Sequence, residues 1–455
     1  MPFYLKLYDD ISLSYRSRLN SFIDSIANGF RSKGINVEIA PICRIEPEFA
    51  SAVKRFEEIE VDAIVTIHLA YSPSLESSTV LANTRLPIII FDTTPTWSFG
   101  PMQNPEERMY NHGIHGVQDM CNLLVRNGKS FIIEAGHWER SDVIDRIVHH
   151  LPAAKAATIM SRGKVGLMGS VFKGMGDFAT TPERFASTIG GRVVPFDTSK
   201  LPQLYQEIDQ SAINEEIEED LRNFVNAGVN TEVHARSVQL SLAIDRWLKR
   251  EGLRAFTFNF QDMVSEAGFS TVPFLAASKA MAKGIGYAGE GDVITALLVA
   301  AIFAINSETT FTEMFCPDWE GESIFLSHMG EMNWHLAEGK PTLREMEWTF
   351  GATGNPAFLS GRLKEGNVIL VSLAPTNEST YRLILAPGQI LPIKGEDRMD
   401  QFVHGWFRPK LSISDFLEEY SIVGGIHHLV LIYTNSIDLL LDFATFMGWE
   451  TKVIG

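Results

Sequence analysis

Histidines and carboxylates gather in the last third of this sequence of 455 residues. Five of the 12 histidines fall there, with acidic residues between or just before them: His328, His335, His404, His427 and His428, and Glu290, Asp292, Glu313, Asp318 and Glu331. Imidazole and oxygen donors without thiolates suit Mn²⁺, Mg²⁺, Co²⁺ or Fe²⁺ better than a structural zinc ion. The region is therefore a candidate site for a catalytic divalent cation.

Two of these carboxylates stand in apolar surroundings. Glu313 follows the segment TTFT, and Glu331 ends the segment LSHMGE. A buried carboxylate is costly unless it is paired or bound to a metal, so two of them close together would need a common partner. We expect Glu313 and Glu331 to take part in such a site.

The adjacent pair His427 and His428 begins an apolar run that reads as a strand. Neighbouring residues of a strand point to opposite faces, so at most one of the two should face a given site. The alternative is one surface histidine and one core histidine with satisfied hydrogen bonds.

Several familiar motifs are missing, among them GxxxxGK[ST], HExxH and GxSxG. A GxGxxG does occur at residues 284–289. Dinucleotide binding requires this motif to follow a strand and to open a helix. Residues 273–283 before it look helical instead, so we interpret it as a tight turn.

The elements that position these residues change along the chain. Apolar runs alternate with amphipathic helices through the first two thirds, which predicts parallel sheets covered on both faces. Past about residue 325, apolar runs follow one another without helices, which predicts an antiparallel sheet or small barrel. We expect an α/β protein with two doubly wound parallel-sheet domains, residues 1–161 and 162–325 with Glu313 in the second, and a mainly antiparallel β domain, residues 326–455.

Composition narrows the function. Hydrophobic residues make up 45% of the chain and charged residues 21%, and the net charge is −17. Such a charge disfavours nucleic-acid and membrane-surface partners. Three scattered cysteines and no recognisable secretion signal or membrane-spanning run favour a reducing, cytoplasmic compartment.

At several of these segments the chain resembles the L-arabinose isomerase family, within the wider group that includes L-fucose isomerase. The segments keep the family's order along most of the chain: NHGIHG with GHW, AFTFNFQD, AGEGD, SHM with Glu331, Lys340-Pro341, and GG with His427-His428. The resemblance implies a ketol isomerase that interconverts an aldose and a ketose. It matches Glu313 and Glu331 with the two catalytic, metal-binding glutamates and His428 with a histidine ligand.

In that family a divalent cation, Mn²⁺ or alternatively Mg²⁺ or Co²⁺, holds adjacent oxygens of an open-chain sugar. One glutamate acts as base and the other as acid across an ene-diol. The family's second histidine ligand follows the Lys-Pro pair, and Glu347 falls at that place here. Glu347 is then either an oxygen ligand, or the site uses three protein ligands.

Other departures concern the substrate. The family's N-terminal substrate-contacting segment reads DDIS here, with Ile11 in it, and His112 stands where the family has glutamine. The resemblance also implies that His115 reaches the active site of a neighbouring subunit in a hexamer, so we expect a homo-oligomer; His112 and His115 are otherwise polar loop residues at a helix end. These departures leave open whether L-arabinose is the substrate. A metal-dependent sugar epimerase, an isomerase of a branched or acidic sugar, and a non-catalytic sugar-binding protein are the alternatives.

Overall fold

A computed structural model describes residues 1–11, 14–377 and 379–455 of the chain, which form two compact units. We call Met1–Thr158 with Leu441–Gly448 the N-terminal unit, and Ile159–Leu440 with Trp449–Gly455 the C-terminal unit.

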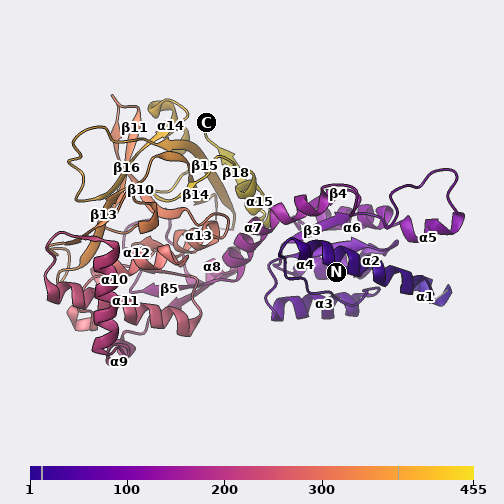
Figure 1. The fold of residues 1–455 in the computed structure, drawn as a ribbon, viewed down its shortest axis with the longest axis horizontal. Helices are drawn as coiled ribbons and strands as arrows, with labels where there is room; N and C mark the ends of the chain where they lie inside the picture. Colours follow the sequence, from indigo (N-terminus) through magenta and orange to yellow (C-terminus); the bar gives the residue numbers. More distant parts are fainter. Residues whose placement is uncertain (12–13, 378) are drawn as a thin grey trace. The chain divides into compact units, whose positions relative to one another are not determined.

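The N-terminal unit is built on a parallel sheet with the strand order β1-β2-β3-β4. Figure 1 labels its strands β3 and β4. Its central strands are mainly apolar, with Thr66, His68 and Asp92 as their polar residues, as is usual for strands covered on both faces. The strands are β1 Pro2–Phe3, β2 Ile64–His68, β3 Ile88–Asp92 and β4 Ile132–Ala135. The helices are α1 Leu7–Ile11, α2 Ser14–Ser32, α3 Glu46–Glu58, α4 Ser78–Asn83, α5 Arg108–Asn111, α6 Ile114–Arg126 and α7 Val143–Arg162, which continues past Thr158 into the C-terminal unit.

The C-terminal unit begins with a second parallel sheet, in the order β6-β5-β8-β9. Its strands are β5 Lys164–Met168, β6 Arg192–Pro195, β8 Ala255–Phe258 and β9 Gly286–Gly289. The helices that accompany it are α8 Pro182–Thr188, α9 Leu201–Gln206, α10 Gln210–Asn223, α11 Thr231–Glu251, α12 Phe274–Ala282 and α13 Val293–Phe303.

The same unit contains a closed antiparallel barrel. Six strands form a ring in the order β15-β14-β17-β10-β11-β16, which the pairing of β15 with β16 closes. Leucines such as Leu326, Leu370 and Leu431 fill its interior. The ring consists of β10 Thr309–Asp318, β11 Ser323–His328, β14 Gly366–Pro375, β15 Tyr381–Ile390, β16 Val403–Pro409 and β17 His428–Tyr433. The remaining elements are β7 Val225–Asn226, β12 Thr342–Glu345, β13 Ala357–Arg362, β18 Glu450–Val453, α14 Ile413–Ile422 and α15 Asp438–Met447.

Helix α13 joins the sheet to the barrel. It is apolar on every side, and its residues from Val293 to Ile302 are buried. It packs against β8 and β9 of the sheet and against β10 and β17 of the barrel. A helix without a polar face is stable only when it is enclosed in this way.

The predicted fold class is confirmed: two parallel α/β sheets and an antiparallel barrel. The domain boundaries at residues 161 and 325 stay predictions, and Glu313 lies on β10 of the barrel sheet. The GxGxxG segment follows helix α12 and enters strand β9, the reverse of the order that dinucleotide binding needs.

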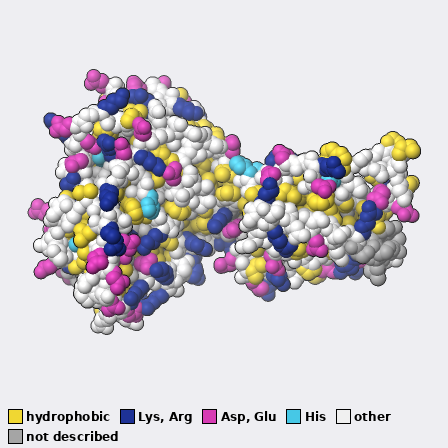
Figure 2. Space-filling model, in the orientation of Figure 1, with side chains coloured by type: hydrophobic (Ala, Val, Ile, Leu, Met, Phe, Trp, Pro, Cys, Tyr) yellow, Lys and Arg dark blue, Asp and Glu magenta, His cyan; other side chains and the backbone are white. Residues whose placement is uncertain are grey.

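Charged side chains of both signs are interspersed on the face that Figure 2 shows. Among the helices of the described residues, none combines the length and the apolar character needed to cross a membrane.

Candidate metal centre and active site

The candidate site lies where the parallel sheet of the C-terminal unit meets the outer face of the barrel. Glu290 comes directly after β9, at the carboxyl end of a parallel strand, which is where ligands bind in α/β folds. Glu313 on β10 and His428 on β17 are directly opposite each other in the ladder. Residues that face each other in this way share one side of the sheet.

Glu290 has an unusual backbone. Its φ of 63° lies in the left-handed region, which costs free energy for any residue except glycine. The next residue, Gly291, has a φ of 83°, and a Cβ there would come within 2.6 Å of the Ser170 carbonyl oxygen. The sharp turn of the AGEGD segment thus aims the Glu290 side chain at the barrel, and strain of this kind is typical of functional sites.

His428 is completely buried and oriented by a carboxylate. Its Nδ1 lies 2.9 Å from Oδ2 of Asp292, which is also buried. Its Nε2 is buried and has no hydrogen-bond partner among the residues that the structure describes, and Oε2 of Glu290 lies 3.4 Å away. A carboxylate on one imidazole nitrogen and a free lone pair on the other are the usual arrangement of a metal-binding histidine.

His427 turns to the same place, contrary to the prediction that only one of the two histidines would. Its Nδ1 lies 2.6 Å from Oδ2 of Asp177, and its Nε2 lies 3.8 Å from Oε2 of Glu290. Strand β17 begins at His428, so His427 precedes the strand and does not follow its alternation.

Glu290, His427 and His428 each offer one donor atom, and these three atoms lie within 4.8 Å of one another. We call these residues the group of converging donors. One carboxylate oxygen and two imidazole nitrogens form a donor set that first-row divalent cations accept. The buried Nε2 of His428 makes no hydrogen bond within the described residues and has only a 3.4 Å contact with Oε2 of Glu290, which a cation between the two atoms would bridge. The residues present therefore fit a divalent cation.

Burial and the neighbouring charged groups set the ionisation of Glu290, His427 and His428. Burial opposes the charge, but the facing imidazoles lower the pKa of Glu290 to about 2. Burial likewise opposes protonation of the imidazoles, yet Asp177 and Glu290 raise the pKa of His427 to about 10, and Asp292 and Glu290 raise the pKa of His428 to about 8. Protons and a cation compete for the same nitrogen lone pairs.

Glu313 and Glu331 lie on either side of His328. The Nε2 of His328 is 4.0 Å from Oε2 of Glu313, and its Nδ1 is 2.9 Å from Oε2 of Glu331. Glu331 is completely buried and accepts a 2.6 Å hydrogen bond from the hydroxyl group of Tyr287. Burial raises the pKa of Glu313 above the usual range, a direction that suits proton transfer near neutral pH.

Comparison with known proteins identifies the family of the C-terminal unit. A model of the L-arabinose isomerase central domain matches residues 183–308, and one of the L-arabinose isomerase C-terminal domain matches residues 308–450. Together they cover more than half of the chain and the whole barrel ring.

Curated relatives extend the match. The L-arabinose isomerase of Anoxybacillus flavithermus is 26% identical over 360 residues, which cover 76% of this chain and 70% of the relative. The L-arabinose isomerases of Geobacillus stearothermophilus and Levilactobacillus brevis are also 26% identical, over 76% of this chain and 71% and 74% of their own lengths. The chain belongs to the L-arabinose isomerase family. Its predicted class, a sugar isomerase and hence an intramolecular oxidoreductase, is confirmed.

The resemblance places Glu347 at the position of the family's second histidine ligand. Glu347 is exposed and lies outside the group of converging donors. Its neighbour Met346 lines a cavity of about 570 Å³ that His328 also lines. Met346 is half-buried against this cavity, whereas Glu347 is exposed to solvent.

The N-terminal residues of the prediction lie in the other unit. Nε2 of His112 is 2.8 Å from the hydroxyl oxygen of Tyr8, and the ring of His115 stacks on Tyr71 at 4.8 Å between centroids. Ile11 ends helix α1, and its side chain lies outside the described residues. These three residues belong to the N-terminal unit, whereas the group of converging donors belongs to the C-terminal unit. The predicted substrate contacts of His112, His115 and Ile11 therefore stay predictions.

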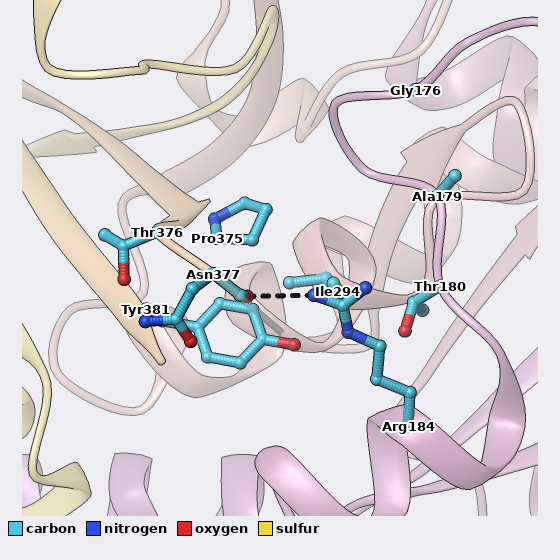
Figure 3. Close-up of a pocket in the computed structure, with 9 residues that line it drawn as sticks. All are labelled: Gly176, Ala179, Thr180, Arg184, Ile294, Pro375, Thr376, Asn377 and Tyr381. Atoms are coloured by element: carbon cyan, nitrogen blue, oxygen red, sulfur yellow. Dashed lines mark hydrogen bonds between the residues drawn. The ribbon is translucent and has the colours of Figure 1, made fainter. Parts of the chain in front are cut away.

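A cavity of about 410 Å³ lies beside the segment that carries Asp177 (Figure 3). Arg184 reaches across it and donates a 2.9 Å hydrogen bond to the carbonyl oxygen of Asn377. The bond ties helix α8 to the chain between β14 and β15.

Sequence reasoning named Glu290, Asp292 and His427 only as members of a loose cluster of histidines and acidic residues, without a role for each, and it did not name Asp177. The AGEGD segment carries a signal for two of them, since an acidic residue between glycines after a strand indicates a strained turn with a carboxylate. Asp177 has no such signal, because its partner His427 is 250 residues away.

Proposed function

We propose that this member of the family is a divalent-metal-dependent aldose–ketose isomerase that acts on a small sugar through an ene-diol. The observation that carries the proposal is the Nε2 of His428, which is buried without a hydrogen-bond partner in the described chain and faces Glu290. In a purely structural role this nitrogen would have only the long contact with Glu290, which satisfies a buried polar atom poorly.

The proposed ligands are His428, Glu313 and Glu331, as the resemblance implies, with Glu290 and His427 added by the geometry. Mn²⁺ is the proposed cation, with Mg²⁺ or Co²⁺ as alternatives. When bound, such a cation polarises the sugar carbonyl and makes the neighbouring C–H bond more acidic.

The remaining steps belong to side chains of the chain itself. Glu313 is the more accessible of the two glutamates, and its raised pKa makes it suitable for moving a proton at the sugar carbon. Glu331 is the second member of the acid/base pair, held by Tyr287 and by His328. Asp292 keeps His428 oriented.

The test is a screen of aldoses and ketoses with the metal-free protein and with added Mn²⁺, with the products identified by NMR in deuterated water. We expect Mn²⁺-dependent conversion between an aldose and a ketose, with deuterium entering the carbon next to the carbonyl. Products that differ only in configuration would indicate an epimerase instead, and binding without any conversion would indicate a sugar-binding protein.

Glu331→Gln is the variant that tests the acid/base pair. Glutamine keeps the size and can still accept the hydrogen bond from Tyr287, but it cannot carry a proton, so we expect exchange to fall by roughly three orders of magnitude or more. Glu365→Gln, at an exposed position of the same unit, is the matched control. Full activity in Glu331→Gln with an intact fold would exclude the assignment.

The family resemblance extends the proposal to a homo-oligomer, possibly a hexamer with active sites between subunits, in the cytoplasm. His112 and His115 would then contact the substrate of a neighbouring subunit. The relatives named above are L-arabinose isomerases, and L-arabinose is the first sugar of the screen.

A further inference from the structure

Two buried hydroxyl groups hold the turns that carry Glu290 and Glu331. Thr257 on β8 is completely buried, and its hydroxyl oxygen accepts a 3.0 Å hydrogen bond from the backbone N–H of Gly291. The same hydroxyl group donates a 3.2 Å hydrogen bond to the carbonyl oxygen of Gly289. One side chain thus bonds the residue before Glu290 and the residue after it.

Ser278 on α12 makes the same pair of hydrogen bonds around Glu331. It is also completely buried, and its hydroxyl oxygen accepts a 3.1 Å hydrogen bond from the backbone N–H of Met332. The hydroxyl group donates to the carbonyl oxygen of Gly330 at 3.4 Å. A hydroxyl group has one donor and two acceptor lone pairs, which allows this double role. The two glutamates are therefore flanked by equivalent contacts that come from different elements.

The backbone of both turns needs support from outside. Strand β9 ends at Gly289 and strand β11 ends at His328, so both glutamates lie beyond the ladder hydrogen bonds of these strands. Glu290 has a φ of 63° and Gly330 has a φ of 140°, both outside the regions that most residues adopt. Such conformations persist only where the surrounding structure over-determines them. The two hydroxyl groups supply contacts of this kind.

Glu313 offers a comparison within the same site. It lies on β10, where the ladder pairs it with Ser327 on one side and with His428 on the other. Regular strand pairing therefore fixes its backbone. The two glutamates that a hydroxyl group holds are the two that lie outside a strand, which indicates that the hydroxyl groups take the place of the ladder at these turns.

We propose that Thr257 and Ser278 are positioning residues, whose hydroxyl groups fix the directions of the Glu290 and Glu331 carboxylates. They act through the two glutamates and not on the sugar. A site of this kind requires its groups to lie within about 0.5 Å of the productive geometry. A small rotation in a turn displaces the distant end of a glutamate side chain more than it displaces the backbone. The inference rests on the proposed function, since it takes Glu290 as a cation ligand and Glu331 as one of the acid/base pair.

Thr257→Val tests the first residue, because it keeps the shape of the buried side chain and removes both hydrogen bonds. We expect the dissociation constant of Mn²⁺, measured by calorimetry, to rise by about 10-fold or more, the usual effect of losing a group that orients a ligand. Thr257→Ser keeps the hydroxyl group and should keep the affinity of the parent protein. Equal affinities in the two variants would overturn the role of Thr257.

Ser278→Ala removes the corresponding hydrogen bonds at Glu331. We expect kcat at saturating Mn²⁺, for the sugar that the screen converts best, to fall by about 10-fold or more, since a small misplacement of a reacting group has effects of this size. KM should change little, because the lost contacts orient an acid/base residue and do not bind the sugar. An unchanged kcat, or a rise in KM alone, would contradict the role of Ser278.

Ser237→Ala is the matched control. Ser237 is a buried serine of α11 in the same unit, and its hydroxyl oxygen accepts a 2.9 Å hydrogen bond from the backbone N–H of Ala357. Its loss should lower the denaturation midpoint about as much as Ser278→Ala does, with kcat and Mn²⁺ affinity unchanged. Equal losses of kcat in the two variants would show a general effect of stability and would overturn the inference.

The inference and the proposed function fail in distinguishable ways. A parent protein that binds Mn²⁺ and converts a sugar, with variants that match it, would leave the isomerase assignment standing and remove the positioning roles. If the parent protein does neither, the proposed function fails, and hydrogen exchange of the Gly291 and Met332 amides still tests the two contacts. Exchange should be about 3- to 10-fold faster in Thr257→Val and in Ser278→Ala, respectively, as expected for one lost hydrogen bond. Unchanged exchange would overturn the inference.

Discussion

At the scale of single residues, Asp292 has two functions. Its Oδ2 lies at the Nδ1 of His428, and its Oδ1 accepts a hydrogen bond from the backbone N–H of Thr295 and caps helix α13. The first function orients the proposed ligand, and the second stabilises the helix. A substitution that keeps the helix cap and changes the contact with His428 separates the two functions.

Asp292→Asn is that substitution. Asparagine caps helices as well as aspartate does, so the helix should keep its stability. Its amide nitrogen would face Nδ1 as a donor, which forces the proton of neutral His428 onto Nε2 and removes the lone pair from the site. We expect the affinity for Mn²⁺ to fall by about 10- to 100-fold, with activity restored by excess Mn²⁺.

Calorimetric Mn²⁺ titration and denaturation midpoints check this prediction together. Asp209→Asn is the control, because Asp209 caps helix α10 through the backbone N–H of Ala212 and is not in the group of converging donors. Unchanged Mn²⁺ affinity in Asp292→Asn would show that His428 does not need this carboxylate.

At the scale of elements, the position of Glu290 depends on how closely α13 lies on β9. A Cβ on Gly286 would overlap the carbonyl oxygen of Ala296 and come within 2.7 Å of the backbone nitrogen of Ala300. Only glycine at this point of β9 lets the helix approach. The packing then fixes the turn between them, which carries both Glu290 and Asp292.

Gly286→Ala should therefore destabilise the C-terminal unit by about 1–3 kcal/mol, as overpacking of a core usually does. The helix can relieve the overlap only by moving away from β9, which would also displace the turn, so Mn²⁺ affinity should fall as well. Denaturant titration measures the first effect. Gly176→Ala is the control, since a Cβ at Gly176 would meet no atom within 4 Å; equal stability of the two variants would contradict the packing argument.

The elements themselves were largely predictable. The apolar runs 61–68, 86–92 and 164–169 predict strands, and the structure has β2, β3 and β5 within them, because strands covered on both faces leave a continuous apolar signal. The sequence also predicts two separate strands at residues 381–386 and 389–393. The structure has one strand there instead, β15, which extends to Ile390 through Pro387 and Gly388. Proline and glycine mark breaks in a sequence, but here the pairing with β14 and β16 holds the strand together.

At the scale of the whole chain, the path of the polypeptide limits what sequence can predict. The apolar surroundings of Glu313 and the family resemblance of His428 indicated these two residues, whereas nothing local brings Asp177 to His427 across 250 residues. The C-terminal region gives a second example, because Leu441–Gly448 belongs to the compact N-terminal unit. Contacts of this kind depend on which distant segments the fold brings together. The periodicity of apolar residues along the sequence does not encode this.

His150 on α7 joins that returning segment to the rest of its unit. Its Nδ1 lies 2.7 Å from Oδ2 of Asp442, and its Nε2 lies 2.9 Å from Oε1 of Glu134. The hydrogen bond to Asp442 is the main cause of a raised pKa, against the opposing effect of burial, and Glu134 adds to it. The folded state therefore binds a proton that the unfolded state releases at a lower pH.

The sign of the pH dependence follows from this difference. The stabilisation is complete below the unfolded pKa of about 6.5 and is lost as pH rises through the higher pKa of the folded state. Protection of residues 438–447 from hydrogen exchange, corrected for the intrinsic rate, should decline as pH rises above about 6.5. His150→Gln should show lower protection at pH 6 and little further decline, while His149→Gln, at the exposed neighbouring position, should decline as the parent does. The same decline in His150→Gln would mean that another group holds the returning segment in place.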